Sequence, residues 1–305
     1  MKFRIIQNRK IFYSISIAVF LISLASLIIW GLKPGLDFTG GSMMEISFSS
    51  ERPQAFEIQE ELKSLNLGEM KVQAEGEKGI LLRFKDVDQP THQQILDTVS
   101  QKFASEENTI KELRFESIGP IIGKETGQKA WLAIIVAVIC IVLYIAYAFR
   151  KVSRPVVSWK YGLSAILALI HDITIVAGIF AILGRFLNIE VDVLFITALL
   201  TILGFSVHDT IVVFDRTREN LSKHYTDFEN VVNDSVNQTI SRSLNTSITT
   251  LLVLFSLFFI GGATIKYFIL ALIIGISIGT YSSIFIASAI IVDWFKFDRK
   301  RKGSR

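Results

Sequence analysis

The chain has 305 residues, of which 50% are hydrophobic and one is a cysteine, and its formal net charge is +4 at pH 7. Its mean hydropathy of +0.46 lies above the usual range of soluble chains. A single cysteine, Cys140, excludes an intrachain disulfide framework and a cysteine-based metal centre. The small positive charge comes from lysines and arginines that flank hydrophobic runs, so it does not indicate nucleic-acid binding.

Long runs with few or no charges predict the membrane-spanning segments. Each span needs about 20 residues of helix to cross a bilayer. The third and fourth runs are each interrupted by a His-Asp pair. The last run is long enough for two spans and contains Gly261–Gly262, which predicts a hairpin. Six spans follow from the runs Ile11–Trp30, Ala130–Phe149, Tyr161–Gly184, Val191–Phe214 and Ser243–Val292.

The first run has the basic flank of a secretory signal peptide. Its length, and the lack of an obvious small-residue cleavage site after Ala25, favour a retained first span instead. We therefore expect residues 1–30 to comprise a basic N-terminus and the first transmembrane helix.

The distribution of lysine and arginine predicts the orientation. Both ends of the chain and the connection near residues 150–160 are basic, whereas the turns on the other side carry only Arg185 and Lys266. Both termini are therefore expected to be cytoplasmic. Residues 31–129 are expected outside, residues 130–292 as a five-helix bundle, and residues 293–305 as a basic cytoplasmic tail. The basic anchors are Lys2, Arg4, Arg9, Lys10, Arg150, Lys151, Arg154, Lys160, Lys296, Arg299, Lys300, Arg301, Lys302 and Arg305.

Residues 31–129 are polar enough to fold in water and contain alternating strand and helix patterns. Their order, β-α-β-β-α-β, predicts a ferredoxin-like α+β domain. The predicted strands are Leu36–Ser47, Met70–Ala74, Ile80–Phe84 and Thr109–Ser117, and the predicted helices are Phe56–Leu65 and Thr91–Phe103.

A glycine-rich segment, GLDFTGG at Gly35–Gly41, lies between the first span and this domain. It does not match a phosphate-binding loop, because no Gly-Lys-Ser/Thr follows and no helix is expected behind it. One interpretation is a turn in which glycines permit positive φ and close backbone approach. The other is a hinge at the base of the domain. The residues of interest are Gly35, Asp37, Gly40 and Gly41.

Two aspartates lie inside the spans, Asp172 in the third and Asp209 in the fourth. Charged groups are costly in hydrocarbon and usually mark proton or ion pathways. Asp209 is about one and a half helical turns, on the order of 9 Å, from the polar end of its span. Each aspartate is either a relay whose charge changes on protonation or a buried carboxylate that bonds to Ser or Thr hydroxyls and specifies helix packing. The preceding histidines, His171 and His208, either titrate or stay neutral.

Arg242, at the start of the fifth span, is a candidate counter-ion for Asp209. Spans four and five run in opposite directions, so their cytoplasmic parts lie at similar depth. The alternative is an interfacial arginine that extends to lipid phosphates. Residues 215–242 form the connection, and their apolar positions share one helical stripe, which predicts an amphipathic helix on the membrane surface or beneath the bundle. These positions are Phe228, Val231, Val232, Val236 and Ile240.

Four motifs occur in a specific order along the chain. They are GLDFTGG after the first span, His-Asp in the third, GFSVHDTIVVFDRTREN at the end of the fourth and SRSLNTS at the start of the fifth. In this order and spacing they resemble the SecF family, the smaller membrane subunits of the SecD–SecF protein-export factor in the RND superfamily. The resemblance extends over essentially the whole chain.

The resemblance implies a six-helix subunit that pairs with SecD, associates with the SecYEG channel and often with YajC, and acts on exported polypeptides. It implies that the proton-motive force across the cytoplasmic (inner) membrane drives this assistance, with no other cofactor, metal or enzymatic activity. It also implies that Asp209 and Arg242 lie in a proton-responsive core, facing an aspartate of SecD. Asp172 is a further candidate for that core.

Two other functions share parts of this pattern. An RND-type exporter of lipids or small molecules would have the same six-span unit and membrane carboxylate, but it requires a second half. An intramembrane aspartyl protease would use Asp172 and Asp209 as a pair that shares one proton. Its Gly-x-Gly-Asp pattern is missing, because Ser206, Val207 and His208 precede Asp209.

Overall fold

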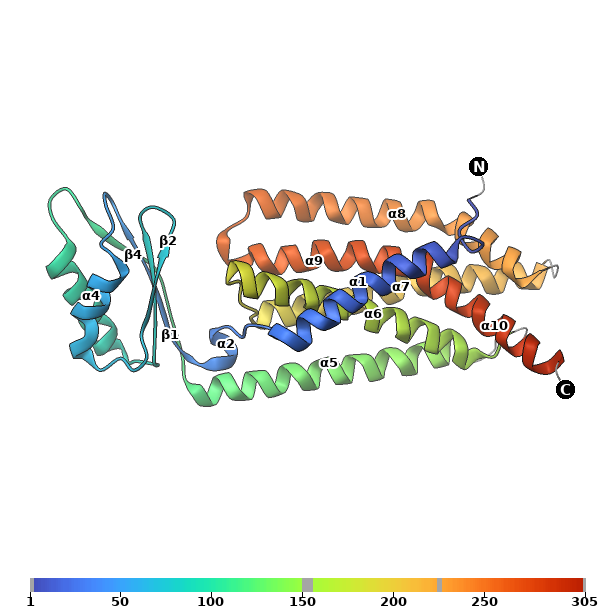
Figure 1. Cartoon of the computed structure of the whole chain (residues 1–305), viewed down its shortest axis with the longest axis horizontal. Helices are drawn as coiled ribbons and strands as arrows, with labels where there is room; N and C mark the ends of the chain where they lie inside the picture. The colour runs from blue at the N-terminus through green and yellow to red at the C-terminus, as the bar shows by residue number, and fades with distance from the viewer. Residues whose placement is uncertain (1–2, 150–155, 224–226, 304–305) are drawn as a thin grey trace. The chain divides into compact units, whose positions relative to one another are not determined.

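The computed structural model describes residues 3–149, 156–223 and 227–303 (Figure 1). The chain divides into two compact units, one made of residues 1–33 and 132–305 and the other of residues 34–131. The expected basic anchors at positions 2, 150, 151, 154 and 305 lie outside the described residues.

Six helices within the described residues are long and apolar enough to cross a membrane, as predicted. The predicted hairpin is confirmed, because one helix ends at Ile260 and the next begins at Ala263. The last span continues through a short π-helical segment, η2. The bounds are α1 Arg9–Trp30, α5 Pro120–Ala148, α6 Ser158–Leu187, α7 Val193–Lys223, α8 Phe228–Ile260, α9 Ala263–Ser282, η2 Ser283–Ala287 and α10 Ser288–Gly303.

The predicted amphipathic connection at residues 215–242 is not a separate helix. Its first part completes α7 up to Lys223, and its second part is the beginning of α8, which runs without a break from Phe228 to Ile260. The apolar stripe is real, since Phe228, Val232 and Val236 belong to the core of the bundle. The stripe therefore packs against the other helices instead of lying on a membrane surface.

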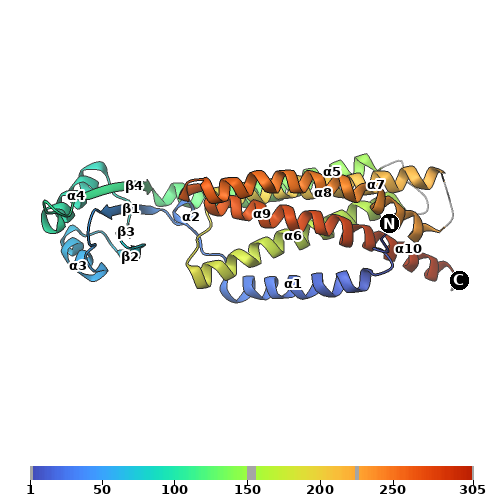
Figure 2. The same ribbon diagram turned by 90° about the horizontal axis from the view of Figure 1, so that it is seen from above.

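The interior of the bundle is formed by α6, α7 and α9, whereas α1 and α5 are mostly exposed. Helix α1 lies along α6 (Figure 2). At their crossing, a Cβ added at Gly178 of α6 would collide with Ser23 of α1. Small residues at such crossings allow helix backbones to approach closely in a membrane, where lipid tails provide no hydrophobic drive between helices.

The second unit is a four-stranded antiparallel sheet in the order β2-β3-β1-β4. Together with its two helices it confirms the predicted β-α-β-β-α-β arrangement. Side chains alternate along β1, and Met44, Ile46 and Phe48 enter the core of this unit. The bounds are β1 Gly41–Phe48, α3 Ala55–Glu61, η1 Leu62–Leu65, β2 Lys71–Glu75, β3 Gly79–Phe84, α4 Gln89–Phe103 and β4 Ile110–Ile118.

The predicted first strand was wrong at its beginning. Leu36–Thr39 forms a one-turn helix, α2, and the strand starts only at Gly41. The two glycines explain the change of direction, because Gly40 has φ +68° and Gly41 has φ +114°. Residues with side chains rarely adopt such backbone angles. The sequence pattern of Leu36–Ser47 did not reveal this turn because Leu36 and Phe38 also fit a strand.

Candidate functional site

Asp209 lies on α7 and is 3% exposed. Its oxygen Oδ2 is buried and has no hydrogen-bond partner, and the same is true of Ser243 Oγ on α8. Ser243 and Arg242 of α8 and His208 of α7 are the polar residues near this carboxyl group. An unsatisfied buried carboxylate oxygen is uncommon and calls for a specific explanation, such as a functional role or a bound ion or water.

Arg242 lies next to Ser243 on α8, and α8 packs against α7, the helix that carries Asp209. The Arg242 side chain is exposed, and it forms no ion pair with Asp209 or with any other described residue. The two predicted partners thus lie on adjacent helices without bonding to each other.

Asp172, on α6, is completely buried. Its Oδ1 pairs with His171 Nδ1 at 3.0 Å, and its Oδ2 accepts hydrogen bonds from Ser206 Oγ at 2.6 Å and Ser282 Oγ at 2.7 Å. Ser206 belongs to α7 and Ser282 ends α9, so one carboxylate connects three helices. This is the packing arrangement that the sequence left as one of two alternatives for Asp172.

Further hydroxyl contacts extend this polar seam between α7, α8 and α9. Thr210 Oγ1 and Ser283 Oγ are 2.9 Å apart, and Ser247 Oγ and Thr280 Oγ1 are 2.5 Å apart. Ser283 also donates to the Ser206 carbonyl at 3.1 Å and opens the π-helical segment η2. Single-turn π-helices inside α-helices often mark functional positions.

Sequence reasoning missed Ser206, Ser243 and Ser282. Serines and threonines occur at many positions of the spans, and nothing in their local pattern separates those that face Asp172 or Asp209 from those that bond to their own helix. The available signal was the position of Ser206 three residues before Asp209, which puts both on one face of α7.

An exposed polar face runs over α7 and α8 beside Asp209. It includes small and hydroxyl-bearing residues as well as one imidazole and one guanidinium group. A spanning helix does not expose such a face to lipid without cost, because polar side chains in membranes almost always face the bundle interior or a partner. Its members are Thr197, Thr201, Gly204 and His208 on α7 and Arg242, Asn245, Thr246 and Thr249 on α8.

The glycine-rich segment has close contacts at its end. A Cβ at Gly40 would lie 2.7 Å from Pro120 Cα, and a Cβ at Gly41 would lie 2.8 Å from the Phe84 carbonyl oxygen. Together with their positive φ, these distances require glycine at both positions. Gly35 has extended angles, φ −82° and ψ −175°, and Asp37 lies in the first turn of α2. The packing of the two glycines favours the interpretation of this segment as a specific turn. Whether the segment also acts as a hinge stays a prediction.

Family models match two parts of the chain. Residues 98–297 match the C-terminal model of the protein export membrane proteins SecD/SecF, and residues 25–51 match the SecD/SecF GG motif.

Curated relatives match almost the whole chain. The protein translocase subunit SecF of Thermobaculum terrenum is 43% identical over 304 residues, covering 95% of this chain and 93% of its own. The SecF subunit of Vibrio alginolyticus is 38% identical over 288 residues, covering 92% of this chain and 86% of its own.

Two solved structures have the same fold. SecDF from Thermus thermophilus superposes with a TM-score of 0.80 at 30% identity, over 96% of this chain and 39% of that chain. SecDF in a super-membrane-facing form gives a TM-score of 0.70 at 30% identity, over 100% of this chain and 40% of that chain. This chain therefore spans less than half of the solved SecDF chains.

Proposed function

The chain belongs to the SecF family of protein translocase subunits, and on that premise we propose that it pairs with SecD in the cytoplasmic membrane and couples the proton-motive force to SecYEG-dependent export. Family membership gives it a role in protein translocation as a multi-pass membrane protein. The observation that carries the finer proposal is Asp209, a buried carboxylate in a spanning helix with one oxygen unsatisfied.

The exposed polar face of α7 and α8 supports pairing with SecD. A protein partner would shield this face from lipid. The solved chains named SecDF are long enough to contain a second half, because this chain covers only 39% of one of them. Arg242 and His208 lie on this face, so an acidic group on the partner would complete the charge pattern. The resemblance supplies such a group as an aspartate of SecD.

The geometry suggests how a proton acts here. When Asp209 is charged, it attracts Arg242, and protonation removes that attraction. Asp172 and its hydroxyl partners hold α6, α7 and α9 together, whereas α8 is among the least buried helices. Helix α8 is therefore the element that changes its position against α7. The membrane potential contributes about 2.3 kcal/mol per charge per 100 mV, enough to bias such a two-state element.

Ion pairs that basic residues of α1 and α10 form at one end of the bundle support the proposed orientation. Arg9 pairs with Glu229 and with Asp293, and Lys296 also pairs with Glu229. Lysines and arginines from α1 and α10 thus meet at one end of the bundle. We assign this end to the cytoplasm, which places both termini there and residues 31–129 on the outer side. YajC and the exported polypeptides are further proposed partners.

The geometry does not favour the protease alternative. Both oxygens of Asp172 are engaged by side chains, and no hydrogen bond joins Asp172 to Asp209. Two carboxylates that share one proton would face each other directly. The exporter alternative has no observation in its support beyond the six-span unit that all these proteins share.

The test replaces Asp209 by Asn and measures export in cells and in energised inverted membrane vesicles. We expect Asp209→Asn to reduce export to the level that wild-type protein shows after an uncoupler collapses the proton gradient. The matched control is Asp215→Asn, an exposed carboxylate on the same helix that pairs with Arg218 at 2.7 Å. It should leave export unchanged. Copurification of SecD and SecY measures assembly, and normal export by Asp209→Asn would contradict the coupling role.

A further inference from the structure

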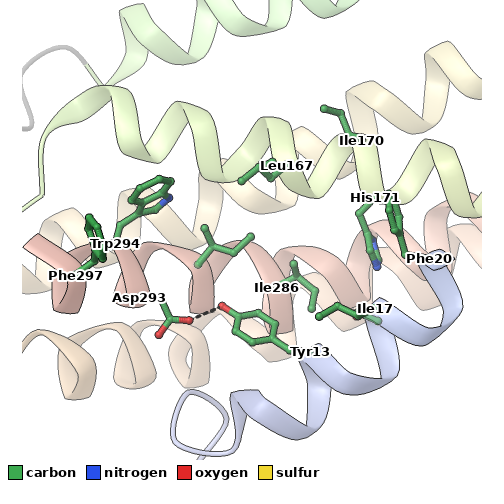
Figure 3. A pocket seen from close by; sticks show the side chains of 12 residues that line it. Tyr13, Ile17, Phe20, Leu167, Ile170, His171, Ile286, Asp293, Trp294 and Phe297 are labelled. Carbon is green, nitrogen blue, oxygen red and sulfur yellow. Dashed lines mark hydrogen bonds between the residues drawn. The ribbon is translucent and has the colours of Figure 1, made fainter. Parts of the chain in front are cut away.

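A groove of about 600 Å³ lies in the helix bundle between α1, α6 and the segment formed by η2 and α10 (Figure 3). This volume is typical of sites for small molecules. The groove does not include Asp209 or Arg242, although His171, the partner of Asp172, lines one end of it. Its walls are almost wholly hydrocarbon and aromatic, with Tyr13, Ile17 and Phe20 from α1, Leu167 from α6, and Ile290 and Phe297 from α10.

The two ends of the groove differ. At one end His171 stacks on Phe20 with 6.1 Å between ring centroids. At the other end Asp293 accepts hydrogen bonds of 2.9 Å from Tyr13 and from Arg9. Trp294 lines the same end, and its buried Nε1 has no hydrogen-bond partner. A hydrocarbon groove with polar groups at one end fits a molecule with an apolar body and a polar head.

Cations surround the end that contains Trp294. On α1 Lys10 lies on the same helix face as the groove-lining residues Tyr13 and Ile17, because the three positions have helical spacing. On α10 Lys300 likewise lies on the face of the groove-lining residues Trp294 and Phe297. Lys10 and Lys300 are exposed and form no ion pair with a described residue.

A third cation reaches this end from α6. Lys160 Nζ lies 5.2 Å from the Trp294 ring centroid and 2.5 Å from Asp298. The Lys160 charge is balanced by Asp298, so the cations without an ion pair near this end of the groove are Lys10 of α1 and Lys300 of α10. Positive charge at one end and hydrocarbon along the rest complement a lipid with an anionic headgroup.

We propose that this groove binds one acidic glycerophospholipid from the surrounding bilayer. An acyl chain lies between α1, α6 and α10. The phosphate lies between Lys10 and Lys300. The lipid thereby joins the first helix of the bundle to the last one at their basic ends.

The experiment uses the full chain purified from membranes and stripped of lipid. Dioleoyl phosphatidylglycerol and dioleoyl phosphatidylcholine are added separately, and native mass spectrometry measures the bound fraction. We expect one high-affinity phosphatidylglycerol, bound about tenfold or more tightly than phosphatidylcholine. The double variant Lys10→Glu/Lys300→Glu should lose that preference, whereas Lys266→Glu, a basic residue of the distant α8–α9 hairpin, should keep it. Equal affinity for the two lipids in wild-type protein would overturn the proposal.

Two further variants test the groove itself. Ile17→Trp fills it and should abolish high-affinity binding of phosphatidylglycerol, whereas Ile28→Trp, on the same helix at a 76% exposed position, should not. Unchanged binding by Ile17→Trp would show that the lipid sits elsewhere. Binding of a copurified polypeptide in the groove instead of lipid would likewise overturn the proposal.

Discussion

Ser206, which lies one helical turn before Asp209 on α7, donates a hydrogen bond of 2.6 Å to the Asp172 carboxylate of α6. The two membrane aspartates therefore lie on neighbouring helices but differ in their bonding. Both oxygens of Asp172 have partners, whereas Asp209 Oδ2 has none. A fully bonded buried carboxylate stabilises one packing arrangement, and an unsatisfied one gains most from a proton or an approaching cation. This contrast favours a packing role for Asp172 and a responsive role for Asp209.

The first prediction concerns the hydroxyls that bind Asp172. Ser206→Ala or Ser282→Ala removes one donor to a buried carboxylate oxygen, which should lower the free energy of unfolding by about 1–3 kcal/mol. The loss is measured as a lower melting temperature of the purified protein in detergent. Ser222→Ala is the control, because that hydroxyl is exposed and bonds only to the Glu219 carbonyl on its own helix. Unchanged melting of both core variants would remove the packing role.

The second prediction separates the two aspartates. Asp172→Asn keeps the shape of the side chain and most of its hydrogen bonds, so we expect reduced thermal stability with export that still responds to the proton-motive force. Asp209→Asn should show the reverse: near-normal stability and export that no longer responds. Thermal stability and gradient-dependent export are measured for both variants on the same membrane preparations. If Asp172→Asn is stable and fails to respond to the gradient, Asp172 takes part in proton handling.

The third prediction concerns the charge of Arg242. Its side chain is exposed, and it lies on α8, which packs against the helix that carries Asp209, so Arg242→Ala should abolish gradient-dependent export without changing the melting temperature. Arg242→Lys retains the charge and should preserve part of the export. Arg218→Ala serves as the control, since Arg218 is exposed and pairs with Asp215 on the same helix. Full export by Arg242→Ala would mean that the arginine only anchors the helix at the membrane surface.

The fourth prediction tests the polar face of α7 and α8. A Cβ added at Gly204 would meet no atom of this chain within 4 Å, so Gly204→Trp should fold normally. If SecD covers this face, the indole prevents close helix packing and SecD no longer copurifies. Val136→Trp, on an exposed part of α5, is the control for adding an indole to a spanning helix. Normal recovery of SecD with Gly204→Trp would place the partner on another face.

The fifth prediction concerns the glycine turn. In Gly40→Ala and Gly41→Ala the residue keeps a positive φ, and its added Cβ lies 2.7 Å or 2.8 Å from a backbone atom. Both variants should therefore destabilise the second unit. Gly76→Ala is the matched control, with φ +59° and no atom within 4 Å of the added Cβ. It should cost only the backbone strain, roughly 1–2 kcal/mol. Hydrogen exchange of the β1 and β4 amides in the full protein measures the difference, and equal effects of all three variants would show that the contacts do not matter.

The sequence by itself determined the six spans, the sheet domain and the positions of the two membrane aspartates. These features depend on the length of hydrophobic runs and on periodicity, which are local properties of the chain. The order of four motifs also sufficed to suggest the family. By contrast, a strand was expected to begin at Leu36, because Leu36 and Phe38 alternate as in a strand and the positive φ of Gly40 and Gly41 cannot be read from local pattern.

Only the tertiary structure decided how each carboxylate is bonded. The partners of Asp172 are 34 and 110 residues away in the chain, and whether their hydroxyls reach it depends on how α7 and α9 are rotated about their axes. The same rotation leaves Asp209 without a full set of partners and puts Arg242 on an exposed face. Helix rotation is set by the packing of all six spans together, so no single segment carries that information.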